Sequence, residues 1–283
     1  MKVAITGARG FIGSNLVRYL NSKDIATVSI SRGDVGPRGA QHHCLDVTSP
    51  SSRNILTQVL ENCDGIVHTV GLAHKNSTSP TDGNFHQVNV RSAEIIADAA
   101  VAAKLSKVVL LSSIKAVADT SRIDEQGKPI PLNDSSSPRP VDDYGRSKLI
   151  AEDAVIRRLK ETSTQSVILR PPLVYGIGQK GNLESVFKLM KKLVLLPVVV
   201  PHFGNMRSMI SVDNLCDAIV SILHAAPISS GRYFLSDMEL STQDLFKAIG
   251  DAHGRRVFVV RCPTELMGLL SRIFGTESKW QKL

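Results

Sequence analysis

A glycine-rich turn near the start of the chain constrains the fold more than any other feature. Residues 2–6 are strand-like, and the apolar residues of 12–20 recur at helical spacing. Glycines between these segments allow a tight turn, a close backbone approach to a pyrophosphate and close packing of helix on strand. The free N–H groups at the start of such a helix attract phosphate. The turn therefore predicts a dinucleotide site, with an ordinary glycine turn as the alternative. The expected contacts come from Gly7, Arg9, Gly10, Phe11, Ile12 and Gly13.

Strands and helices alternate through residue 169. Further strands are expected at 25–30, 43–45, 65–70, 107–111 and 166–169, and helices at 53–60, 88–103 and 144–160. This alternation is typical of βαβ units and predicts an α/β fold with a doubly wound parallel sheet, the Rossmann arrangement. After Pro171-Pro172 the alternation stops. We therefore expect a dinucleotide-binding Rossmann domain over 1–172 and a smaller, mainly substrate-binding lobe over 173–283, of which about 208–225 returns to pack on the Rossmann sheet.

The end of the second strand bears on which dinucleotide is bound. An acidic residue there would bind the ribose 2′-hydroxyl of NAD, whereas this chain has Ser31 and Arg32. A guanidinium suits a phosphate as a bidentate donor, and Arg9 in the glycine turn can reach the same region. These residues favour NADP(H), with NAD(H) as the other possibility and a solvated loop as the alternative role of Arg32. Asp46 and Val47, at the end of the third strand, are expected to touch the adenine ring or to form a plain turn.

A tyrosine and a lysine four residues apart begin the helix expected at 144–160. Tyr144 and Lys148 share one helix face, so the ammonium can lie near the phenol and lower its pKa. Such a tyrosine can exchange a proton with a sugar hydroxyl or carbonyl near neutral pH. Ser112 and Ser113 end the fifth strand, where ligands bind in parallel sheets, and a hydroxyl there can hold the reacting oxygen. With the glycine turn, these residues indicate an oxidoreductase; a solvated pair and a serine turn are the alternatives.

Composition narrows the class of protein. The net charge is +8, from 34 basic and 26 acidic residues, but the basic residues are scattered, which argues against nucleic acid as a partner. The four cysteines form no CxxC pair and the histidines have no metal-ligand spacing, so we expect no metal site. The longest apolar run, 193–201, is far too short for a bilayer span, and no secretory signal pattern follows Met1. We therefore expect a cytoplasmic protein without membrane insertion.

Motifs along nearly the whole chain support a family assignment. They are TGARGFIG (6–13), VNV (88–90), LLSSIK (110–115), YGRSK (144–148), LRPPLVYG (169–176) and RSMISVDNL (207–215). In this order they resemble the extended short-chain dehydrogenase/reductase family, also called the NAD-dependent epimerase/dehydratase family. Within it the chain is most similar to bacterial nucleotide-sugar 4-ketoreductases, which make UDP-N-acetyl-6-deoxyhexosamines of the quinovosamine or fucosamine type for surface polysaccharide. Ala118 and Asp119 depart from the pattern, since many members have an aromatic residue or Asn and then Gly there.

The resemblance implies roles for individual residues. The catalytic set would be Ser113, Tyr144 and Lys148, of which Lys148 would also hold the nicotinamide ribose. Pro171 would contact the cofactor. Asn182 and Arg207 would contact the nucleotide diphosphate, because a guanidinium binds pyrophosphate with paired hydrogen bonds. A loop cap and a surface charge are the alternatives for these two residues.

The resemblance also implies a reaction and an assembly. NADPH would reduce the 4-keto group of a UDP-4-keto-6-deoxy-N-acetylhexosamine. A UDP-sugar 4-epimerase with tightly bound NAD is one alternative, and a non-catalytic dinucleotide-binding sensor is another. Family dimers pair two helices of each subunit, so we expect a homodimer formed through 90–104 and 144–160.

Overall fold

The structure is a computed structural model, and it describes residues 1–73, 84–126, 128–179, 184, 198–201, 205–254 and 256–260. The chain forms two compact units. The first consists of Met1–Val174 and Ile210–Ser236, and the second of Tyr175–Met209 and Asp237–Leu283. The first unit is therefore discontinuous, because the chain leaves it after Val174 and returns at Ile210.

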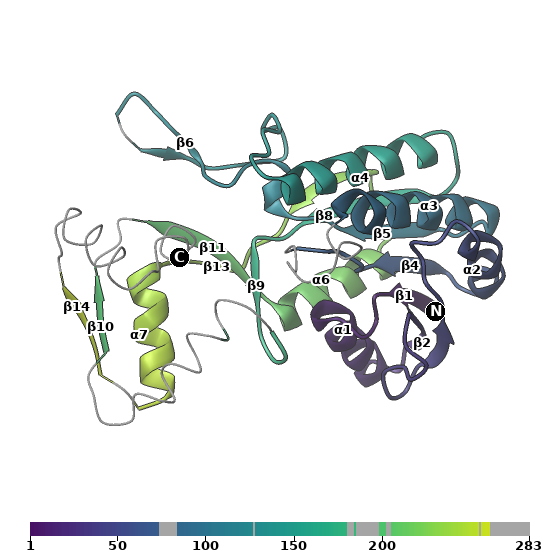
Figure 1. The fold of residues 1–283 in the computed structure, drawn as a ribbon, viewed down its shortest axis with the longest axis horizontal. Helices are drawn as coiled ribbons and strands as arrows, with labels where there is room; N and C mark the ends of the chain where they lie inside the picture. Colours follow the sequence, from purple (N-terminus) through teal and green to yellow (C-terminus); the bar gives the residue numbers. More distant parts are fainter. Residues whose placement is uncertain are drawn as a thin grey trace. The chain divides into compact units, whose positions relative to one another are not determined.

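A seven-stranded sheet forms the centre of the first unit (Figure 1). Side by side, its strands are β12 (Gly231–Phe234), β8 (Gln165–Arg170), β5 (Lys107–Leu111), β4 (Gly65–His68), β1 (Lys2–Thr6), β2 (Ala26–Ser31) and β3 (Gln41–Cys44). All neighbouring strands are parallel, which confirms the predicted doubly wound α/β fold. Sequence analysis missed β12, because this short edge strand is partly exposed along its whole length and lacks an apolar run. The third and fourth strands end earlier than expected, at Cys44 and His68.

Helices cover both faces of this sheet. On one face lie α2 (Ser52–Leu60), α3 (Ser92–Ala102) and α4 (Asp143–Leu159), and on the other lie α1 (Phe11–Ser22) and α6 (Val212–His224). Strand β1 contributes to the cores on both faces, because successive side chains of a strand point to opposite faces of the sheet. Ala4 joins the core under α2, α3 and α4, whereas Val3 and Ile5 join the core under α1 and α6. A π-helix, His86–Arg91, runs directly into α3, so the predicted helix begins earlier than residue 88.

The segment around 208–225 contributes α6 to the first unit. This helix packs against α1, and its apolar face includes Leu215 and Ile219. Lys107, buried at the start of β5, donates hydrogen bonds to the carbonyls of Ile222 (2.8 Å) and Ala225 (2.6 Å) at the end of α6. A buried ammonium there satisfies carbonyls that the helix leaves without partners and complements the negative end of its dipole.

The order of the strands reverses at β1. Strands β2 and β3 extend the sheet on one side of β1, and the remaining four extend it on the other. In open α/β sheets, ligands bind outside the carboxyl ends of the strands beside such a reversal. Because all the strands are parallel, the residues that follow them gather at one edge. That edge collects the glycine turn, Ser31, Ser113 and Pro171.

Smaller sheets complete the fold. Strand β11 (Met206–Ser211) pairs antiparallel with β13 (Met238–Ser241), and β9 (Leu173–Tyr175) completes this three-stranded sheet. In the second unit, α7 (Thr242–Ala252) packs Phe246 and Ile249 against Met209. Strand β10 (Val198–Pro201) pairs with β14 (Val257–Val260). Between β5 and α4 lie a 3₁₀ turn, η2 (Ile114–Ala116), and a hairpin of β6 (Arg122–Ile123) and β7 (Pro129–Ile130). Within the described residues, no helix has the length and apolar character that a membrane span requires.

Candidate active site

The glycine turn packs tightly between β1 and α1. Gly7 has a φ of +73°, which favours glycine, and a Cβ there would lie 2.8 Å from Thr69 Oγ1. A Cβ on Gly13 would lie 2.3 Å from the carbonyl oxygen of Gly7. Gly10 precedes α1, and no side chain of the described residues caps that helix end. The N–H groups at the start of α1 are therefore available to a phosphate.

Arginine and serine side chains lie together where β2 ends. The Arg9 guanidinium lies directly over Gly33, because a Cβ on Gly33 would come within 1.4 Å of Arg9 Nη1. Arg32 is exposed in the same loop. The Ser31 hydroxyl is buried and has no hydrogen-bond partner among the described residues. Burying a hydroxyl without a partner costs free energy, so this atom fits a site that a ligand completes.

Other polar residues near this loop bear on the same site. Asp34, which was not among the predicted site residues, forms a hydrogen bond with the Cys44 thiol that raises the pKa of that thiol. Asp46 lies beyond the end of β3, and its Oδ1 accepts hydrogen bonds from the N–H (2.9 Å) and hydroxyl (2.8 Å) of Thr48. Val47 is 5% exposed and belongs to the core. Asp46 therefore forms a strand-end turn, and contact of Asp46 and Val47 with an adenine ring stays a prediction.

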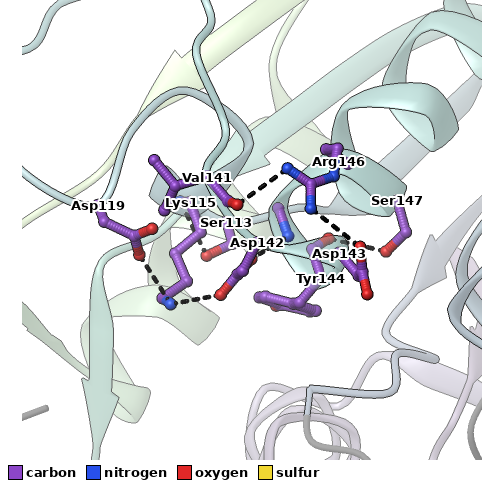
Figure 2. Close-up of polar contacts among 10 residues, drawn as sticks. Ser113, Lys115, Asp119, Val141, Asp142, Asp143, Tyr144, Arg146 and Ser147 are labelled. Carbon is purple, nitrogen blue, oxygen red and sulfur yellow. Dashed lines mark hydrogen bonds and ion pairs between the residues drawn. The ribbon is translucent and has the colours of Figure 1, made fainter.

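The two serines after β5 have different surroundings. Ser112 is buried, and its hydroxyl donates to Glu152 Oε1 in the interior. Ser113 has an extended backbone, and its hydroxyl accepts the N–H of Lys115 at 3.2 Å. It also forms a hydrogen bond with Tyr144. Of the two hydroxyls, that of Ser113 is the one that meets the start of α4 (Figure 2).

Tyr144 lies in the first turn of α4. Asp142 caps this helix, since its Oδ1 accepts the N–H of Gly145 at 2.7 Å. The phenol ring contacts the ring of Phe85, with centroids 6.3 Å apart. Burial raises the pKa of the Tyr144 hydroxyl, and the hydrogen bond with Ser113 and the charge of Lys115 offset only part of this effect. The expectation of a lowered pKa is therefore wrong for the protein alone, because burial outweighs the nearby positive charge.

Lys148 lies one turn further along α4 and is 3% exposed. Its Nζ donates to the carbonyl of Leu111 at 2.6 Å, and a Cβ on Gly71 would lie 3.7 Å from Nζ. The ammonium therefore lies at the carboxyl ends of β4 and β5. Burial lowers the pKa of Lys148 to about 8, against the opposing charge of Glu152. The positive charge of Lys115, from the turn after Ser113, acts to lower the pKa of Tyr144.

A buried ion cluster, which was not predicted from the sequence, lies one helical turn beyond Lys148 on α4. Glu152 of α4 is fully buried and accepts hydrogen bonds from Arg170 Nε (3.1 Å) and Nη2 (2.6 Å) at the end of β8. Arg232 Nε of β12 donates to the same carboxylate at 2.9 Å. The Ser112 hydroxyl, directly after β5, also donates to it. The cluster thus ties α4 to three strands. One signal for it was available, since Glu152 continues the four-residue spacing of Tyr144 and Lys148 onto the buried helix face.

Asn89 connects the loop after β4 to α4. Its Oδ1 accepts the N–H of Leu72 at 2.7 Å, and its Nδ2 donates to the carbonyl of Leu72 (3.1 Å) and to Ser147 Oγ (2.8 Å). The VNV motif contains this residue, but the sequence did not reveal its role. The role of Asn89 could have been suspected from the sequence, because Asn89 is a polar residue on the apolar face of the predicted helix.

His68, at the end of β4, is a buried core residue. Its Nδ1 lies 2.6 Å from Thr6 Oγ1 and its Nε2 lies 3.0 Å from Ser92 Oγ. Burial lowers the pKa of His68 to about 3, and the charge of Lys148 acts in the same direction. The ring is therefore neutral near pH 7 and fixes the end of β4. Within the described residues, no cluster of His, Cys, Asp or Glu side chains could hold a metal ion.

Three residues predicted to contact cofactor or substrate remain. Pro171, directly after β8, is buried, and its carbonyl accepts the N–H of Ile114 at 3.0 Å. Arg207 lies on β11 in the second unit, and its Nε is buried without a partner among the described residues. Burial lowers the pKa of Arg207. Asn182 lies outside the described residues.

Comparison with known proteins gives the site its context. A family model described as the NAD dependent epimerase/dehydratase family matches residues 3–234. The chain belongs to this family. Members of the epimerase/dehydratase family are NAD(P)-dependent oxidoreductases of the extended short-chain type, and this protein is an enzyme of that class.

Individual family members are similar over most of the chain. The UDP-glucose 4-epimerase of Vibrio cholerae is 28% identical over 282 residues, which cover 96% of this chain and 82% of that protein. The structure of the UDP-N-acetylglucosamine 4-epimerase from Bacillus cereus has a TM-score of 0.75 at 20% identity, over 92% of this chain and 85% of that one. A UDP-glucose 4-epimerase of Thermus thermophilus, in complex with NAD, has a TM-score of 0.71 at 20% identity, over 95% and 92%. At this level of identity, the solved structures establish the fold alone.

Proposed function

We propose that the protein is a nucleotide-sugar 4-ketoreductase. Its substrate would be a UDP-4-keto-6-deoxy-N-acetylhexosamine, reduced with NADPH during the synthesis of precursors for O-antigen or capsule. The observation that carries the proposal is the meeting of Ser113 and Tyr144, with Lys148 alongside, at the edge of the sheet where α/β enzymes bind ligands. The names of the relatives, among them UDP-sugar 4-epimerases and a GDP-6-deoxy-D-talose 4-dehydrogenase, support a nucleotide sugar as the substrate class.

The residues around the glycine turn fit a phosphorylated dinucleotide. The turn leaves no room for a Cβ on Gly7 or Gly13, and the start of α1 offers its N–H groups to the pyrophosphate. Arg9, Arg32 and the Ser31 hydroxyl, which has no partner in the described part of the chain, would hold the 2′-phosphate of NADP(H). Lys148 would hold the nicotinamide ribose, with Pro171 nearby. When bound, the nicotinamide supplies the hydride for C4 of the sugar.

The proton for this reduction would come from Tyr144. A raised pKa keeps the phenol protonated near neutral pH, as a proton donor requires. The Ser113 hydroxyl, which already bonds to Tyr144, would hold the sugar O4 while that oxygen receives the proton. Arg207, with a buried Nε that has no partner among the described residues, would bind the nucleotide diphosphate together with Asn182.

A UDP-sugar 4-epimerase with tightly bound NAD is the second candidate. The name of the Vibrio cholerae relative favours it, and so does Asp34, because a carboxylate in the loop after β2 suits a ribose 2′-hydroxyl. Tyr144 and Ser113 would have the same roles in both enzymes. The two candidates differ in whether the cofactor is consumed.

Cofactor consumption therefore tests the proposal. Purified protein is given UDP-4-keto-6-deoxy-N-acetylglucosamine with NADPH or with NADH, and the nicotinamide absorbance is followed. We expect stoichiometric oxidation with NADPH preferred, and an Arg32→Ala variant that loses about tenfold in affinity for NADPH, equivalent to ~1.4 kcal/mol. Interconversion of UDP-N-acetylhexosamines without net oxidation, or NAD that copurifies with the protein, would replace the reductase with the epimerase.

We further propose that the enzyme acts as a cytoplasmic homodimer formed through α3 and α4. The resemblance to family dimers supports this assembly, and α4 carries an exposed apolar residue, Ile150, which is 47% exposed. Size-exclusion chromatography with light scattering is expected to give twice the mass of one chain. A monomer at all concentrations would exclude the dimer.

A further inference from the structure

Lys115 lies two residues after Ser113 and takes no part in the proposed proton or hydride transfer. It belongs to η2, the 3₁₀ turn directly after Ser113. Its Nζ lies 2.7 Å from Asp119 Oδ1 and 2.9 Å from Asp142 Oδ2 (Figure 2). Burial acts to lower the pKa of Lys115, but the hydrogen bonds and charges of these two carboxylates outweigh it and raise the pKa overall. The side chain is therefore a fixed cation, held between two anions.

The same residue forms the contact between the loop after β5 and the start of α4. A Cβ on Gly145 would lie 2.3 Å from the Lys115 carbonyl oxygen, so the two backbones touch. Asp142 closes this contact with both of its oxygens, since Oδ1 accepts the Gly145 N–H and Oδ2 pairs with Lys115. Ser113 joins it as well, through the bond from the Lys115 N–H. The bond between Ser113 and Tyr144 therefore depends on how Lys115 and Asp142 hold these segments together.

We infer that Lys115 is a positioning residue of the active site, which fixes the first turn of α4 against Ser113 and keeps a positive charge at the cap of that turn. This inference rests on the proposed role of Tyr144. Lys115 would not exchange a proton in the reaction. The proton would pass from the Tyr144 oxygen to the sugar oxygen, and Lys115 would keep its own three protons throughout.

The charges around Tyr144 explain why Lys115 has this effect. Lys115 acts on the hydroxyl from η2 and lowers its pKa, and Asp142 acts from the helix cap and raises it. Asp119 faces Lys115 from the loop that follows η2. Lys148, on the same helix face as Tyr144, directs its ammonium to the Leu111 carbonyl instead. Asp143 and Arg146 pair with each other in the same turn and are at least half exposed, at 60% and 51%. Phe85 contributes an uncharged ring.

The inference predicts opposite shifts for two substitutions. In Lys115→Met, the carboxylate of Asp142 acts on Tyr144 without its counter-charge, so the pKa of the hydroxyl is expected to rise. In Asp142→Asn, the side chain can still cap α4 but carries no charge, so the pKa is expected to fall. Lys115→Arg is expected to restore the wild-type value. Arg146→Met is the matched control, because it removes a cation from the same turn that is exposed and paired with Asp143.

Tyrosine labelled with ¹³C at Cζ reports these shifts without any substrate. The chain has four tyrosines, and Tyr144→Phe assigns the signal of interest. The expected midpoints are higher for Lys115→Met, lower for Asp142→Asn, and unchanged for Arg146→Met and Lys115→Arg. Equal midpoints in wild type and Lys115→Met would overturn the inference, even if that variant were less stable, because a merely structural residue would not move the titration.

A kinetic measurement separates this inference from the proposed function. With the 4-keto sugar and NADPH, the alkaline limb of the kcat profile in Lys115→Met is expected to shift upward by the same interval as the NMR midpoint. If Tyr144→Phe were fully active, the proposed function would fail whatever the titration showed. If Tyr144→Phe were inactive but Lys115→Met kept the wild-type profile, only the inference would fail.

Discussion

The phosphate-binding end and the reacting end of the site differ in what determines their geometry. At the end that would bind the dinucleotide phosphates, the geometry comes from backbone, and a Cβ on Gly7 or Gly13 would collide with neighbouring atoms. At the reacting end, the geometry comes from charged and polar side chains, in which Glu152 and Lys115 each bind several partners. One added methyl group is therefore expected to disrupt the phosphate-binding end. At the reacting end, the change of a single charge is expected to have the larger effect.

This difference explains how one helix can carry groups with different tasks. Tyr144, Lys148 and Glu152 follow one another along α4, and their surroundings become progressively more buried. Tyr144 meets Ser113 and half-exposed charges, Lys148 meets a backbone carbonyl, and Glu152 meets two guanidinium groups. Each group therefore has partners of a different kind outside α4, although one helix carries all three.

The largest effect is expected from Glu152→Gln. The substitution keeps the shape of the side chain but leaves Arg170 buried without its counter-charge, which costs about 3–5 kcal/mol of unfolding free energy. Asp153→Asn is the matched control, because Asp153 pairs with the same Arg232 but is 58% exposed, and it is expected to cost less than about 1 kcal/mol. Urea denaturation measures both values. Equal losses in the two variants would contradict the view that the reacting end depends on a buried charge.

A smaller effect is expected from Gly13→Ala. The added methyl would lie 2.3 Å from the Gly7 carbonyl oxygen, so strand and helix must separate, at a cost of about 1–3 kcal/mol of unfolding free energy and a clear loss of affinity for NADPH. Gly231→Ala on β12 is the control, since the atom nearest to its methyl would be the Tyr233 hydroxyl oxygen at 3.4 Å, an ordinary van der Waals contact. Calorimetry of NADPH binding and thermal unfolding check the two effects. Wild-type affinity in Gly13→Ala would show that the turn does not hold the pyrophosphate.

Much of the fold could be predicted because short stretches of sequence determine most of its turns and strands. The glycine turn follows directly on β1. Six of the seven strands of the large sheet were predicted from short runs of residues, and their predicted ends lie within a few residues of the observed ones. Strand β12 has no such run, and only its pairing with β8 makes it a strand. It also lies beyond about 208–225, the segment that the sequence predicts to return to the sheet.

The side chains of the site could be named, but their electrostatics could not be predicted. The spacing of Tyr144 and Lys148 places both on one face, yet it does not show that Lys148 reaches the Leu111 carbonyl, or that Lys115 is the cation beside the phenol. Burial of Tyr144, which reversed the expected direction of its pKa, depends on packing that no local pattern encodes. Glu152 looks like an ordinary acidic residue of a helix until Arg170 and Arg232 are seen to meet it.

The most direct test of the account is the turnover of Tyr144→Phe with the 4-keto sugar and NADPH, measured beside its affinity for NADPH. The account predicts that turnover falls by about 10²- to 10⁴-fold, because the proton donor is lost, while cofactor affinity stays at the wild-type value. Tyr233→Phe, which alters a tyrosine bound to the Ser229 carbonyl, is expected to keep full activity. Wild-type turnover in Tyr144→Phe would contradict the assignment of the proton donor and, with it, the proposed reaction.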